Sequence, residues 1–248
     1  MIVLAIDQEE IANTLDKVTE LISLRQQQLE KLDQLVKSRF VEMFGNPITN
    51  PFNWEKAQLQ TYLLDIENGK SIVCSTKPRQ GEWPAILKLS AATYGEYRPE
   101  ENKALLDDGQ YIESVEVHKG DLLFTRKNTP ELVGMAAYVR STPAKLMMPD
   151  LVFRINTKEQ CTKVFLWQLI NHKLFRTKIQ ELATGSAKSM SNISKERLMK
   201  LEVYMPPIEL QNCFATFVTQ IDKSKFKIQQ SLEKLETLKK ALMQKYFG

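Results

Sequence analysis

The chain has 248 residues and a mass of 28.6 kDa, with 43% hydrophobic and 26% charged residues, which excludes a disordered or fibrous protein. No stretch approaches about 18 uninterrupted apolar residues, so no membrane-spanning helix is expected. The N-terminal sequence MIVLAIDQEE has no basic residues before its apolar run and turns acidic, so it is not expected to be a signal peptide.

The cysteines and histidines favour a protein of the reducing cytoplasm without a metal centre. The three cysteines, Cys74, Cys161 and Cys213, are odd in number and far apart, as in proteins without disulfides. The chain has only 2 histidines, which nearly excludes His-based catalytic triads and His-rich metal sites.

The net charge of +4 is distributed unevenly along the chain. Residues 119–200 carry 15 Lys and Arg against 6 Asp and Glu, a net charge of +9. Residues 1–45 carry 5 basic and 8 acidic groups, residues 46–118 carry 7 and 11, and residues 201–248 carry 7 and 5. A basic block of this kind is typical of proteins that bind polyanions, because each phosphate contact releases a counterion. The alternative is a solvated lysine-rich face.

Residues 1–45 predict a long amphipathic helix that ends at Gly45, before Asn46-Pro47. Apolar residues recur at an alternating spacing of four and three, broken by Arg25 and Arg39, which is typical of a coiled-coil seam. The seam residues are Ile11, Leu15, Val18, Ile22, Leu29, Leu32, Val36 and Met43.

Residues 46–207 predict a compact α+β domain, because Gly and Pro are concentrated there and short β-like runs alternate with turn signals. A helix is expected over Thr162–Leu182, and a second, short helix is expected to follow the N-cap residue Ser194. The predicted strands are Ala85–Ser90, Gln110–Val117, Asp121–Thr125, Met135–Arg140, Leu151–Asn156 and Leu201–Met205.

Two predicted loops in the basic block are candidates for DNA contact. The first follows a strand and carries Arg126, Lys127, Asn128 and Thr129, of which Arg and Lys suit guanine or phosphate and Asn suits adenine. The second, Ala183–Ser194, is small, polar and basic, and its candidate residues are Ser186, Lys188 and Ser189. For either loop taken alone, a solvated turn is the alternative.

Residues 208–248 predict a second long helix that repeats the first. LEKLETLKKALMQKYFG (Leu232–Gly248) matches LEKLDQLVKSRFVEMFG (Leu29–Gly45) without a gap. Its seam, interrupted by Lys225 and Lys239, consists of Phe214, Val218, Ile221, Ile228, Leu232, Leu235, Leu242 and Tyr246. Because the first helix is acidic and the second basic, pairing one with the other is favoured, either within the chain or in a dimer. The alternative is a pair of ordinary core helices in a bundle.

The sequence contains no recognisable catalytic motif. It has no GxxxxGK[ST] phosphate-binding loop, no GxGxxG motif and no Cys/His cluster at metal-binding spacing. MPPI (Met205–Ile208) lacks the leading polar residue and the closing aromatic residue of the amino-methyltransferase motif. The chain is therefore expected to be non-catalytic.

Three segments, in their order along the chain, resemble the specificity subunit of type I restriction-modification systems. GDLLFTRKNTPELVGMAAYV (Gly120–Val139) is similar to the family's central target-recognition segment. TGSAKSMSNISKERLMKLEVYMPPIELQ (Thr184–Gln211) is similar to its closing segment, and the repeated LEKL helix is similar to its spacer. Members of the family contain two recognition domains, whereas this sequence has one between two spacer helices and resembles a half-sized form.

The resemblance implies a subunit that recognises one half of a bipartite site in double-stranded DNA and docks methyltransferase subunits. It implies no cofactor on this chain, with S-adenosylmethionine on the methyltransferase and ATP and Mg on a restriction subunit. IDQEEIA (Ile6–Ala12) is similar to the end of a closing segment, so the chain is expected to begin where an upstream recognition domain would end. A homodimer, an exchangeable half-subunit and a truncated remnant remain open. The alternative from another class is a coiled-coil scaffold whose middle domain binds protein.

Overall fold

A computed structural model describes residues 2–184 and 190–247, with side chains described from Glu9 onward. The chain forms two compact units. One consists of Met1–Glu42 and Thr216–Gly248, and the other consists of Met43–Ala215. Among the described residues, no helix combines the length and the apolar character needed to cross a membrane. The expectation of an α+β domain with two long helices is confirmed.

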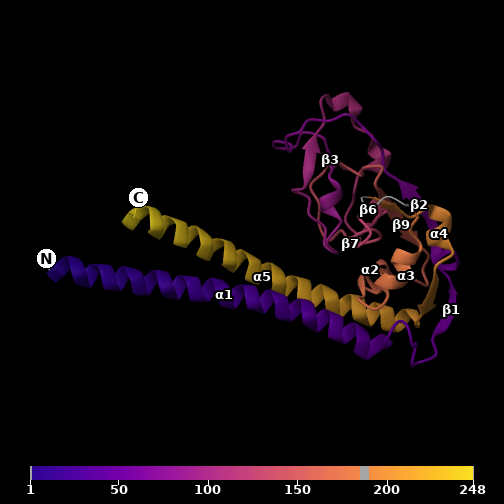
Figure 1. Cartoon of the computed structure of the whole chain (residues 1–248), viewed down its shortest axis with the longest axis horizontal. Helices are drawn as coiled ribbons and strands as arrows, with labels where there is room; N and C mark the ends of the chain where they lie inside the picture. The colour runs from indigo at the N-terminus through magenta and orange to yellow at the C-terminus, as the bar shows by residue number, and fades with distance from the viewer. Residues whose placement is uncertain (1, 185–189, 248) are drawn as a thin grey trace. The chain divides into compact units, whose positions relative to one another are not determined.

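The helical unit is an antiparallel pair of helices, α1 (Ile2–Phe44) and α5 (Ile208–Phe247), which lie side by side (Figure 1). Lys225 Nζ lies 2.7 Å from Asp33 Oδ1, and the Arg39 guanidinium lies 5.9 Å from the centre of the Phe217 ring. Of the two pairings that the sequence left open, the structure therefore has the one within the chain.

The two helices pack against each other through the apolar seams predicted from the sequence. Every seam residue from Ile11 to Met43 and from Phe214 to Leu242 is buried or half-buried, whereas Tyr246 is 41% exposed. The interrupting Lys225 is tolerated because its ammonium group extends to the Asp33 carboxylate. Since the chain's own helices occupy both seams, any further partner has to contact other faces of the pair.

The globular unit is built around a four-stranded antiparallel sheet of order β2-β9-β5-β7. Its strands are β2 (Leu63–Asn68), β9 (Val152–Thr157), β5 (Leu122–Thr125) and β7 (Ala136–Tyr138). Phe124 and Phe153 stack between neighbouring strands with ring centres 6.5 Å apart. Helix α2 (Lys163–Asn171) is fixed to the edge strand by Asn171, whose side-chain amide bonds both the N–H and the carbonyl of Ala136.

A three-stranded sheet and two short ribbons complete this unit. The sheet has the order β4-β3-β8, with β3 (Ala85–Leu87) antiparallel to β4 (Asn102–Ala104) and parallel to β8 (Leu146–Met147). The ribbons pair β1 (Glu55–Gln58) with β11 (Glu202–Met205) and β6 (Lys127–Asn128) with β10 (Ser191–Asn192). The short helices are η1 (Leu59–Tyr62), η2 (Leu89–Ala91), η3 (Asp108–Gln110), η4 (Glu113–Val115), α3 (Arg176–Glu181) and α4 (Lys195–Met199).

Three predicted elements are wrong in detail. The strand predicted over Ala85–Ser90 ends at Leu87, because the 3-10 helix η2 begins at Leu89. Gln110–Val117 is not a strand, because η3 ends at Gln110, η4 covers Glu113–Val115, and of this segment only Glu116 forms a bridge, with Met147. The single helix predicted over Thr162–Leu182 is two helices, because α2 ends at Asn171 and α3 begins at Arg176. The helix predicted after Ser194 is α4, whose N-cap is the Ser194 hydroxyl.

Because the seam residues of the helical pair are buried, truncating one of them should lower the free energy of unfolding. Leu232 is 6% exposed, so Leu232→Ala removes buried methyl groups and should lower the free energy of unfolding by about 2–5 kcal/mol. Leu238, on the same helix, is 46% exposed, so Leu238→Ala is the matched control and should have little effect. Urea denaturation followed by circular dichroism measures both, and equal losses would contradict the assignment of the seam.

Candidate nucleic-acid interface

The β6–β10 ribbon brings together the two segments that the sequence singled out. Lys127 pairs with Asn192 and Asn128 with Ser191, and the Ile193 N–H donates to the Arg126 carbonyl at 2.8 Å. Lys127 and Asn128 are therefore in a strand rather than in the predicted loop, because the closing segment supplies a partner strand. Predicted site residues Ser186, Lys188 and Ser189 lie outside the described residues.

Two cations flank one aromatic ring beside this ribbon. The Arg126 guanidinium lies 5.2 Å from the centre of the Phe153 ring, and Lys195 Nζ lies 5.9 Å from the same centre. Phe153 is only 1% exposed, so the ring is a fixed support for both side chains. Lys195 was not among the residues predicted from the sequence to contact DNA, although its position directly after the N-cap Ser194 marked the start of a helix.

Asn128 and Thr129 have different environments. Asn128 is 7% exposed, its side-chain NH₂ donates to Thr93 Oγ1 at 3.1 Å, and its side-chain carbonyl accepts from the Thr129 N–H at 2.8 Å. Thr129 is exposed and follows the strand directly. The Asn128 amide thus joins strand β6 to the segment that follows η2.

Two buried polar atoms at this ribbon have no hydrogen-bond partner among the described residues. They are Nε of Arg126, a donor, and Oδ1 of Asn192, an acceptor. Buried polar groups in proteins are nearly always paired, so unpaired ones call for an explanation. Both lie in segments that the sequence selected independently as candidates for contact with DNA.

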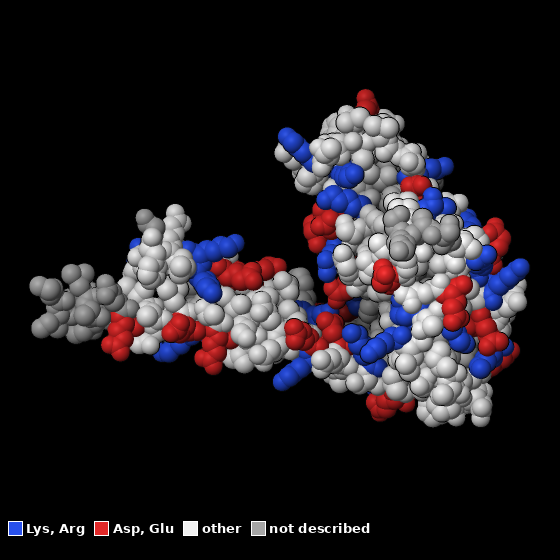
Figure 2. Space-filling model, viewed as in Figure 1, with Lys and Arg blue, Asp and Glu red and all other residues white. Residues whose placement is uncertain are grey.

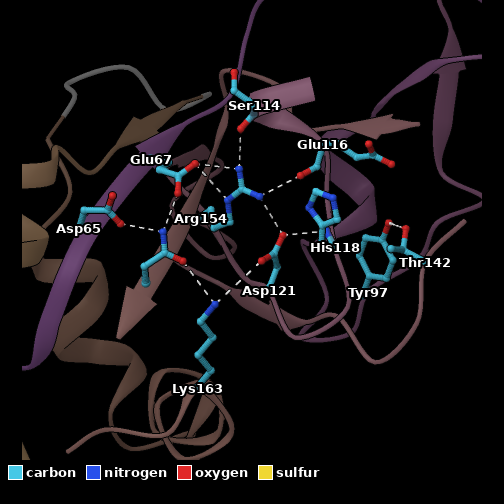
Figure 3. Close-up of polar contacts among 11 residues, drawn as sticks. Asp65, Glu67, Tyr97, Ser114, Glu116, His118, Asp121, Thr142, Arg154 and Lys163 are labelled. Atoms are coloured by element: carbon cyan, nitrogen blue, oxygen red, sulfur yellow. Dashed lines mark hydrogen bonds and ion pairs between the residues drawn. The ribbon is translucent and has the colours of Figure 1, made fainter. Parts of the chain in front are cut away.

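The basic block also supplies cations that are used inside the domain. Arg154 on β9 donates to Glu67 Oε2 at 2.8 Å, to Asp121 Oδ2 at 3.1 Å, and to the carbonyls of Ser114 and Glu116 at 2.8 Å each (Figure 3). Because Arg154 is 7% exposed, this network joins β9, β2 and the segment before β5 as a structural centre.

Lys163 and Arg176 are also committed to the fold. Lys163 Nζ lies 3.3 Å from Asn156 Oδ1, and burial lowers the Lys163 pKa against the opposing effect of Asp121. Arg176 donates to the carbonyls of Gly134 and Val133 at 2.6 Å each, and burial lowers its pKa to about 10. At least three of the 15 basic residues of the block therefore serve the interior.

The remaining charge does not form one continuous basic surface on the face in view. Figure 2 shows Lys and Arg interspersed with Asp and Glu over this face of the globular unit. Contact with a polyanion therefore depends on where individual cations lie. Arg126 and Lys127, which the sequence selected, lie at the β6–β10 ribbon, and Lys195 lies over the same Phe153 ring as Arg126. Among residues 2–184 and 190–247, no three His, Cys, Asp or Glu side chains are grouped to hold a metal ion.

Comparison with known proteins decides the family. A family model described as the type I restriction modification DNA specificity domain matches residues 51–240. The chain belongs to this family. The match includes the whole β6–β10 ribbon and α4 and confirms the resemblance found in the sequence.

Curated members of the specificity family are similar to part of this chain. The EcoEI specificity subunit of Escherichia coli is 30% identical over 168 residues, which cover 66% of this chain and 28% of that subunit. The putative MjaX specificity subunit of Methanocaldococcus jannaschii is 30% identical over 208 residues, which cover 79% of this chain and 46% of that subunit. The chain thus spans less than half the length of each relative.

Solved specificity subunits share the fold. The type I restriction-modification S subunit from M. genitalium aligns with a TM-score of 0.62 at 13% identity and covers 97% of this chain and 60% of that one. The HsdS subunit from Thermoanaerobacter tengcongensis aligns with a TM-score of 0.50 at 17% identity and covers 96% of this chain and 56% of that one. At these identities the likeness concerns the fold alone.

The Arg154 network predicts a large loss of stability when its cation is removed. Arg154→Ala leaves the Asp121 carboxylate, whose side chain is 10% exposed, without its buried partner, and should lower the free energy of unfolding by about 3–5 kcal/mol. Lys56→Ala removes a cation from an exposed pair, 4.0 Å from Glu202, and should cost about 0–1 kcal/mol. Denaturant unfolding of both variants tests this, and a loss below 1 kcal/mol for Arg154→Ala would contradict the structural role.

Proposed function

We propose that this chain is the DNA specificity component of a type I restriction-modification complex and reads one half of a bipartite duplex target. The observation that carries the proposal is the β6–β10 ribbon, where two basic segments, predicted separately to contact DNA, lie side by side. Membership in the specificity family supports the same assignment.

In this proposal the ribbon and α4 present cations to the DNA. A two-stranded ribbon fits the major groove, where Arg and Lys hydrogen-bond guanine, while Lys also pairs with phosphate. Arg126, Lys127, Lys195 and the exposed Thr129 are assigned to contacts with DNA. Asn128 is assigned to positioning, because both ends of its amide bond neighbouring protein groups. Ser186, Lys188 and Ser189 remain assigned to DNA contact on the sequence alone.

The chemistry of methylation and cleavage is assigned to other subunits. The chain itself is proposed to be non-catalytic and to act in the cytoplasm, with S-adenosylmethionine bound by methyltransferase partners and ATP and Mg by a restriction subunit. The helical pair is proposed to be the spacer on which the methyltransferase subunits dock.

We further propose that two copies of the chain act together. A two-fold dimer of single recognition domains would read a palindromic target with a non-specific gap. Because the seams pair within the chain, the dimer would use apolar residues on other faces. Among the described side chains of α1, Leu21, Leu24 and Leu35 are each at least 44% exposed.

The DNA-binding proposal predicts distinct effects for two ribbon residues. Arg126→Ala should weaken binding to the target by about 1–3 kcal/mol through the loss of a base contact, with less effect on other sequences. Lys127→Ala should weaken binding to all sequences alike and reduce the slope of log affinity against log salt by about 1, as expected for a phosphate contact.

Fluorescence anisotropy with labelled duplexes enriched from a random pool by the wild-type chain provides the measurement. The control is Lys56→Ala on β1, which removes one positive charge at a site outside the ribbon. This variant should bind DNA as wild type does. Wild-type affinity in both ribbon variants would refute the site. DNA affinity of the wild type that does not fall with salt would favour the protein-binding scaffold.

The dimer proposal predicts a mass of about twice 28.6 kDa in light scattering at micromolar concentration. Leu21→Asp with Leu24→Asp should shift this species to the monomer, because both leucines are exposed on the helical pair and a carboxylate opposes burial in an interface. A wild-type chain that is monomeric at these concentrations would contradict the dimer.

A further inference from the structure

The segment that follows η2 is a short loop held at several points. The Arg98 N–H closes it by donating to the Ala91 carbonyl at 2.9 Å. Thr93 Oγ1 donates to the Leu89 carbonyl at 2.7 Å and accepts from Asn128, and the Gly95 carbonyl accepts from the Trp167 indole at 2.8 Å. The loop Ala91–Arg98 is therefore fixed to the same strand, β6, that carries Lys127.

Two side chains point outward from this fixed loop and contact one another. Tyr94 is 54% exposed although its neighbours Thr93 and Gly95 are buried. The Arg98 guanidinium lies over the Tyr94 ring, 5.1 Å from its centre. Because the loop is anchored at several points, Tyr94 and Arg98 are presented from a fixed backbone.

Stacking prepares an arginine for recognition. When a guanidinium stacks on an aromatic ring, its N–H groups point outward in the guanidinium plane and can bond external acceptors. The ring also restricts the rotamers of the arginine, so less side-chain entropy is lost on binding. The planar fork of N–H groups matches O6 and N7 of guanine.

We propose that Tyr94 and Arg98 form a second base-reading element, in which Arg98, supported by Tyr94, recognises a guanine in the half-site bound by the β6–β10 ribbon. The proposal rests on the proposed function, since it requires that the ribbon contacts duplex DNA. Arg98 is the residue that determines specificity, and Tyr94 is a positioning residue that acts through it. The Asn128–Thr93 hydrogen bond fixes the distance between the two reading elements.

The test is enrichment of duplexes from a random library by the full-length chain. The motif enriched by wild type should contain a guanine that is absent from the motif enriched by Arg98→Ala. The other positions of the two motifs should be the same. Arg98→Lys should lose the same guanine, because the ammonium keeps the charge but not the fork. Preference for guanine at that position should fall by about tenfold or more.

Matched variants separate this element from general effects. Tyr94→Ala should weaken the same guanine preference, and Tyr94→Phe should retain it, because only the ring supports Arg98. Lys56→Ala should enrich the wild-type motif. Thermal unfolding should be unchanged in all of these variants, since Tyr94 and Arg98 are exposed.

Each result has a distinct meaning. An unchanged motif with Arg98→Ala overturns the inference while leaving the proposed function intact, and so does a uniform loss of affinity, which would indicate a phosphate contact. A wild-type chain that enriches no motif overturns the proposed function and this inference together. Loss of one guanine in both Arg98 variants, with the remaining positions preserved, supports both.

Discussion

Asn128 is the residue on which the arrangement of the candidate interface depends. Its backbone pairs with Ser191 in the β6–β10 ribbon, and its side chain holds Thr93 and caps the Thr129 N–H. The segments that contain Thr93, Asn128 and Ser191 are distant in sequence and therefore meet at Asn128, whose side chain is almost entirely buried. Because the Asn128 side-chain NH₂ bonds Thr93 and its backbone pairs with Ser191, the segments are held at defined distances, which the proposed reading of base pairs requires.

The charge of the basic block serves two purposes. Arg154, Lys163 and Arg176 hold the sheet and its helices together through carboxylates and carbonyl groups of the domain. Other cations lie at the ribbon, where Phe153 supports Arg126 and Lys195 from the interior. The net charge of the segment therefore overstates the positive charge available to a partner, because buried contacts determine which cations remain available.

The sequence was sufficient for features that depend on local periodicity and insufficient for those that depend on distant contacts. The helical seams follow a repeat of apolar residues, and the cap at Ser194 follows from its hydroxyl. QYIESVEV alternates as a strand does, yet Val115 is buried from the 3-10 helix η4 and Val117 from the segment after it, so periodicity alone indicated the wrong element. The hydrogen bond between Asn128 and Thr93 joins segments 35 residues apart, for which the sequence has no local signal.

Amide hydrogen exchange of the full-length chain, with and without duplex DNA that carries its target, tests the proposed DNA interface most directly. DNA binding should protect residues 91–98, 126–129 and 191–195 together, since Asn128 joins these segments. Protection confined to the helical pair, or to one of the three segments alone, would contradict it.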